Sequence, residues 1–145
     1  ANMFKTVVNI PVIQITYNSH EKLLYLDWKK EASIEEYQRA MIECLEFGRV
    51  YKVENLISDI RKQKQINPDN RKWFKSQILP TASKDLNLKR AGIIYDGSWL
   101  QKKYLKNIMR SAEKYELHIK MFTSEESALR WIRKPKFNLK ELFFG

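Results

Sequence analysis

Two largely apolar runs of strand length stand in the first thirty residues, separated by a polar turn. Residues 7–17 are rich in β-branched side chains and are interrupted by Pro11. This pattern predicts one strand or two short pieces at a sheet edge. Residues 18–22 form a polar turn, and residues 23–28 (Leu-Leu-Tyr-Leu-Asp-Trp) follow as a second strand. The simplest arrangement of the two is a hairpin.

A helix start follows at Ser33, because Glu36 stands three residues further on and the two side chains can form a capping box. Apolar positions recur at helical spacing over residues 34–45. Gly48 is a suitable left-handed stop for this helix. Residues 55–60 (Asn-Leu-Ile-Ser-Asp-Ile) then predict a short strand.

The second predicted helix begins at Asn67, which can cap it, with Pro68 at the first helical position and Asp69 against the helix dipole. Apolar side chains between residues 73 and 78 give this helix a buried face. Pro80 is expected to end it.

The remaining elements alternate between strand and helix. Residues 91–95 predict a strand, residues 100–112 a long amphipathic helix, and residues 118–122 a last strand. Ser124 is expected to cap a final helix that runs through Ile132. The order β-β-α-β-α-β-α-β-α predicts an α/β fold with a five-stranded mixed, largely parallel sheet and about four helices.

Length and composition favour a single domain. The chain has 145 residues, of which 43% are hydrophobic and 12% aromatic, enough to bury a core. We expect one domain over residues 1–133. The apolar tail 134–145 is expected to pack on that domain or on a second subunit, the latter giving a homodimer.

The single cysteine is typical of a protein of a reducing compartment, and the hydropathy pattern predicts no membrane span. One cysteine excludes a disulfide framework, and no apolar run approaches the roughly 18 residues of a membrane span. The first residues have no signal-peptide pattern, and a cytoplasmic location is the expectation.

The net charge of +10 is concentrated in one part of the chain. Residues 61–110 hold 13 basic and 3 acidic side chains. Such a field could attract nucleic acid, anionic lipid or an acidic protein, or it could be a solvated surface. The helical row of Leu100, Tyr104 and Ile108 points the aromatic ring inward, which weighs against stacking on nucleic acid.

No arrangement of residues favours catalysis or metal binding. His20 and His118 are the only histidines, and Cys44 lies on the apolar face of the first helix. Phosphate-binding glycine loops and nucleophile-elbow motifs do not occur. The sequence therefore predicts neither an enzyme nor a cofactor.

Several ordered segments resemble the STAS superfamily of anti-sigma-factor-antagonist domains, and in particular its SpoIIAA-like branch of small bacterial proteins. The segments that carry the resemblance are Leu24–Trp28, Ser33–Tyr37, Asn55–Arg61, Ile66–Trp73, Lys89–Ile94 and Phe122–Ile132. Together they extend over nearly the whole chain to about residue 133.

The resemblance implies a five-stranded mixed sheet and a non-enzymatic role in regulation or protein binding. Regulatory members are switched by phosphorylation of a Ser or Thr at the start of the helix after the third strand. Here that stretch is Asn67-Pro68-Asp69-Asn70, so we expect the switch to be missing. A looser likeness to lipid-binding Sec14-type domains implies an apolar pocket between sheet and helices.

Two candidate sites follow. A protein partner, as yet unidentified, would dock at the corner between the third strand and the second helix, with contacts from Asp59, Arg61, Lys62, Lys64, Asn67, Asp69 and Arg71. The alternative is a small apolar molecule or lipid in a pocket with Trp28, Trp73 and Trp99 as walls. At strand and helix positions these tryptophans are more often plain core residues.

Overall fold

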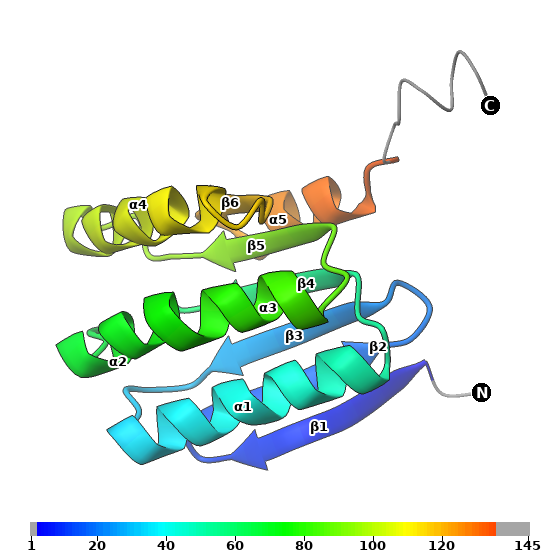
Figure 1. The fold of residues 1–145 in the computed structure, drawn as a ribbon, viewed down its shortest axis with the longest axis horizontal. Coiled ribbons are helices and arrows are strands. Elements are labelled where there is room, and N and C mark those ends of the chain that lie inside the picture. The colour runs from blue at the N-terminus through cyan, green and yellow to red at the C-terminus, as the bar shows by residue number, and fades with distance from the viewer. Residues whose placement is uncertain (1–2, 136–145) are drawn as a thin grey trace.

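A six-stranded mixed sheet is the centre of the computed structural model, which describes residues 3–135 (Figure 1). The strands lie in chain order across the sheet. The pairs β1/β2 and β2/β3 are antiparallel, and β3 to β6 are parallel. The strands are β1 (Phe4–Ile10), β2 (Ile13–Asn18), β3 (Leu23–Trp28), β4 (Asn55–Asp59), β5 (Arg90–Ile94) and β6 (Ile119–Phe122).

The predicted number of five strands is wrong by one at the N-terminus. The segment around Pro11 forms two strands, because Ile10 pairs with Ile13 and the two residues between them close a tight hairpin. Proline has no backbone N–H and suits this turn. The predicted hairpin around residues 18–22 is confirmed, and it joins β2 to β3.

Four helical rods accompany the sheet, as predicted. The second rod is continuous and consists of α2, a π-helical segment η1, and α3. The helices are α1 (Ile34–Val50), α2 (Pro68–Trp73), η1 (Phe74–Ile78), α3 (Leu79–Asp85), α4 (Trp99–Glu113) and α5 (Glu125–Arg133). Capping by Ser33, Asn67 and Ser124 is confirmed at the starts of α1, α2 and α5.

Two predicted helix ends are wrong. Gly48 does not stop α1 but lies buried inside it, where a Cβ atom would come within 3.1 Å of Leu86 Cδ2. Its missing side chain makes room for the end of the second rod. Pro80 does not end the second helix but stands in the first turn of α3, directly after the π-helical segment.

The connecting helices all cover one face of the sheet. Figure 1 shows α1, the α2–η1–α3 rod and α4 side by side in front of the strands. The other face is covered by α5, which packs Ala128 and Ile132 against Leu23, Ile57 and Ile94. Adjacent positions such as Leu56 and Ile57 therefore belong to the two different cores.

Ion pairs tie the start of β5 and the end of α5 to the hairpin between β2 and β3. Glu54 lies 3.0 Å from Lys89 Nζ and 3.2 Å from Lys22 Nζ. Arg133 donates two hydrogen bonds to the Glu21 carboxylate, at 2.7 and 3.1 Å. The pair with Lys89 takes up one positive charge of residues 61–110, away from the loop that follows β4.

Within residues 3–135, no helix combines the length and the apolar character that crossing a bilayer requires. The predicted apolar tail begins at Lys134 and Pro135, and its residues 136–145 lie outside the described residues.

The Glu54 pair predicts a pH dependence. The two lysines lower the pKa of Glu54 below its ordinary value of 4.5. Its charge therefore stabilises the fold above that value, and the contribution is lost as the pH falls through the lowered pKa. We expect urea denaturation to show a smaller loss of stability between about pH 6 and pH 3 in Glu54→Gln than in the parent chain.

The matched control is Glu43→Gln, since Glu43 is exposed and its one ion pair within residues 3–135 is with Arg39, one helical turn away at 3.6 Å. An unchanged acid profile in Glu54→Gln would contradict the prediction.

Candidate functional site

An apolar cavity of about 110 Å³ lies between the sheet and the helices of the front face. The sheet contributes side chains from β3 to β6 that alternate with those facing α5, and α1, the second rod and α4 close the other side. Sheet residues in its wall are Leu26, Trp28, Leu56, Ser58, Ala91, Ile93 and Ile119. Helix residues are Tyr37, Met41, Cys44, Leu45, Phe74, Ile78, Leu79, Ala82, Tyr104, Leu105 and Ile108.

Small side chains explain why space is left here. Ser58 and Ala91 stand on the neighbouring central strands β4 and β5, and Ala82 stands on the rod above. Native cores are otherwise packed to the density of organic crystals. A cavity of this size is therefore a defined feature of the packing.

The π-helical segment shapes one wall. The Leu79 N–H donates to Phe74 O, five residues back. In a regular α-helix the ring of Pro80 would collide with the carbonyl group of Ser76, and the wider turn avoids this. Both ends of the segment, Phe74 and Ile78, line the cavity. π-Helical turns occur often at functional sites.

Stacked rings form one end of the cavity. Trp28 is 2% exposed and stacks on Tyr37, with ring centroids 5.3 Å apart. Trp73 meets Tyr37 edge to face at 6.2 Å, outside the cavity wall. Burial raises the pKa of Tyr37 well above its ordinary value, so its hydroxyl stays neutral.

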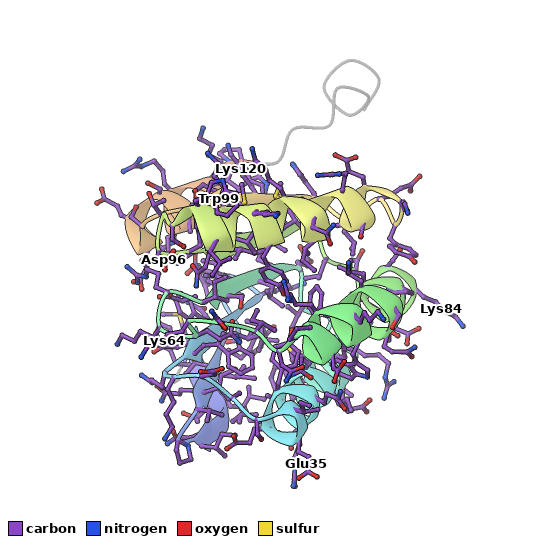
Figure 2. The ribbon with its side chains drawn as sticks, turned by 90° about the vertical axis from the view of Figure 1, so that its left-hand side faces the viewer. Glu35, Lys64, Lys84, Asp96, Trp99 and Lys120 are labelled. Atoms are coloured by element: carbon purple, nitrogen blue, oxygen red, sulfur yellow. The ribbon has the colours of Figure 1, made fainter. Side chains whose placement is uncertain are left out.

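The three predicted pocket tryptophans are therefore not together. Trp28 lines the cavity, and Trp73 lies behind Tyr37. Trp99 is 72% exposed and has Lys103 Nζ 5.2 Å from its ring centroid. Figure 2 shows it on the outer side of α4. Trp99 does not line the cavity, because the first buried residue of α4 is Gln101, two positions later.

Two buried glutamines lie at the edge where the parallel strands end. Gln101 uses its side chain fully: Nε2 donates to Ile60 O at 3.1 Å, and Oε1 accepts from the Asp96 N–H at 2.9 Å. It thereby fixes the loop after β4 to the start of α4. Gln63, in that loop, is 2% exposed and belongs to the cavity wall. Among the described residues, none donates a hydrogen bond to its Oε1.

Several residues of the predicted docking corner are already engaged in contacts within the chain. Arg61 donates two side-chain hydrogen bonds of 2.7 and 3.0 Å to Asp59, which is only 7% exposed. Asn67 is engaged as the cap of α2, and its Oδ1 accepts from the Asp69 N–H at 2.8 Å. These two pairs therefore hold the loop and the helix start in shape.

The remaining corner cations point outward or border a second hollow. Lys62 and Lys64 are exposed, on either side of the inward Gln63. Lys64 has a positive φ of 59°, which turns the loop at this point. Arg71 lies 5.7 Å from the Tyr104 ring, and with Lys64 it borders a hollow of about 330 Å³. Figure 2 views the molecule from this edge, with Lys64 at its rim.

Sequence reasoning missed both glutamines. Gln101 had a signal, because it continues the buried helical row of Leu105, Ile108 and Ala112. Gln63 had none, since it stands in the polar run Arg-Lys-Gln-Lys-Gln.

Comparison with known proteins finds no family model, no curated protein and no solved structure that matches the chain. Among residues 3–135, no three His, Cys, Asp or Glu side chains are grouped as metal ligands would be. The apolar cavity and the loop beside it are the features from which a function can be argued.

Cys44 offers a test of the cavity's character. Burial raises the pKa of its thiol to about 12. We expect alkylation by iodoacetamide near pH 8 to be about a hundredfold slower or more in the folded chain than in the chain unfolded in urea, because little thiolate forms and access is closed. The rate of mass increase measures this. Equal rates in both states would contradict a closed apolar cavity at Cys44.

Proposed function

We propose that the chain is a non-enzymatic binding module that holds one small, mostly apolar molecule between its sheet and its helices. The observation that carries the proposal is the cavity of about 110 Å³ with nearly all-apolar walls. An engineered apolar cavity of about 150 Å³ stays dry and takes benzene, so a space of this order suits one ring or a short aliphatic chain.

The chemistry of the wall favours binding over catalysis. Burial raises the pKa of the Tyr37 and Tyr104 phenols and of the Cys44 thiol in this wall, so all three are neutral near pH 7. The wall also includes His118, an exposed residue directly before β6. A wall of this kind binds a ligand through complementary shape and apolar contacts. The STAS resemblance, with its regulatory role, stays a prediction that is compatible with a ligand-binding module.

Filling the cavity tests the proposal. Ala82 faces the cavity from α3, and a longer side chain there would occupy its space. We expect Ala82→Met to weaken binding of toluene at least about tenfold while the free energy of unfolding stays equal or rises by about 1 kcal/mol, as in other cavity-filling substitutions. Chemical-shift titration and urea denaturation measure the two quantities.

The control is Asn87→Met, because Asn87 is exposed although both of its neighbours, Leu86 and Leu88, line the cavity. Native mass spectrometry of the gently purified chain should also show a small-molecule adduct that Ala82→Met lacks. A parent chain with neither an adduct nor toluene-induced shifts would refute the proposal.

A second candidate is docking of an acidic protein partner at the loop after β4. Lys62 and Lys64 are exposed there, and Gln101 holds the backbone of the loop in place. Arg61 adds little free charge, because Asp59 pairs with it at 2.7 Å. A preformed pair of cations suits an acidic surface.

This candidate predicts that Lys62→Glu with Lys64→Glu reduces partner recovery in pull-downs about tenfold or more, with unchanged thermal unfolding. Arg61 is left intact, because reversing its charge would strand the buried Asp59 carboxylate. Lys84→Glu with Lys114→Glu changes the net charge equally at exposed positions elsewhere. If both double variants lose the partner alike, only net charge matters and the corner is not the site.

A further inference from the structure

Gln63 belongs to the cavity wall, and its buried side-chain oxygen has no hydrogen-bond partner among the described residues. Its backbone N–H donates to Ile60 O at 3.1 Å, which closes the turn after β4. Its side chain is turned inward between two exposed lysines, and within residues 3–135 nothing donates to its enclosed Oε1. This is the single buried side-chain oxygen or nitrogen in the described part of the chain that lacks a partner.

An unpaired buried acceptor lowers the stability of the folded state. A buried oxygen that has lost its hydrogen bonds to water, and gained none, destabilises the folded state. Methionine or leucine at this position would avoid the penalty with similar volume. Gln101 shows that the same edge of the molecule can satisfy a buried glutamine completely. Local inconsistencies of this kind are expected at functional sites.

We propose that Gln63 Oε1 is the recognition atom of the cavity and accepts a hydrogen bond from a hydroxyl or N–H group of the bound molecule. This inference rests on the proposed binding function and narrows its ligand to a neutral molecule with one small apolar ring or chain and one donor. The apolar part fills the space beside Ala82 and Ala91, and the donor end lies toward the loop after β4.

The composition of the cavity wall favours a neutral ligand over a charged one. In the described chain, no Asp, Glu, Lys or Arg side chain lines the cavity. His118 belongs to the wall, but it is exposed and packs its ring on Trp131, with centroids 5.3 Å apart. It precedes β6, at the opposite end of the parallel strands from the loop that holds Gln63. A carboxylate or an ammonium group inside it would lose its hydration without meeting an opposite charge from these residue types, which is strongly unfavourable. A fatty acid is therefore a poor ligand, whereas a small alcohol, a phenol or a pyrrole-like N–H compound fits this chemistry.

Phenol, toluene and benzoate are matched probes, because they share one ring and differ in the substituent. We expect phenol to bind more tightly than toluene once both values are corrected for transfer from water, and benzoate not to bind. In Gln63→Met the preference for phenol over toluene should fall about three- to tenfold, the worth of one hydrogen bond. Chemical-shift titrations of Ile93, a cavity residue that the parent chain and the variant share, give the dissociation constants.

Gln65→Met is the control, since Gln65 is an exposed glutamine in the same loop. We also expect Gln63→Met to raise the urea midpoint of the ligand-free chain, because the unpaired oxygen is gone, while Gln65→Met leaves it unchanged. A variant that is more stable and yet less selective for phenol separates recognition from a structural role.

The outcomes distinguish the two proposals. If toluene and phenol bind and Gln63→Met leaves their ratio unchanged, the cavity binds apolar molecules but Gln63 does not recognise them, and this inference is overturned. Benzoate binding as tight as that of phenol overturns it as well. If neither toluene nor phenol binds the parent chain, the proposed function fails and the inference fails with it.

Discussion

The direction in which the parallel strands follow one another determines most of this structure. From β3 to β6 each strand is added on the same side of the previous one. Because crossovers between parallel strands are right-handed, every connecting helix must then lie on the same face of the sheet. That face receives α1, the second rod and α4, and the other is left to α5 (Figure 1). The cavity lies on the crowded face.

The extra hairpin strand is part of the same constraint. Neighbouring strands lie about 4.8 Å apart, whereas packed helices need about 8–10 Å, so three rods require more width than β3 to β6 provide. The antiparallel strands β1 and β2 supply that width. Val8 and Ile15 belong to the core under the helices, and Tyr17 packs on Phe47 of α1 with ring centroids 5.0 Å apart.

Local sequence patterns were sufficient to predict most helices and strands. They were insufficient to predict which side chains line the cavity. Side-chain caps such as Ser33 and Ser124 act within one turn, so the starts of α1 and α5 follow from the sequence. Pro11 and Pro80 each predict a break in regular structure. Pro11 lies in the turn of the β1–β2 hairpin, whereas Pro80 lies within a helix that continues after a π-helical turn. Packing against the sheet decides between these outcomes. The inward position of Gln63 depends on the loop's path and has no sequence pattern.

The contrast between Gln101 and Gln63 bears on why the cavity persists. A fold selected only for stability would fill a space of about 110 Å³ and remove an unpaired buried oxygen, since each change needs one substitution and each would stabilise the folded state. Gln101, at the same edge, meets the ordinary requirement that buried polar groups are paired. Under the proposed function, the cavity and the unpaired acceptor beside the π-helical turn have a single cause, because one bound molecule would fill the space and donate the missing hydrogen bond.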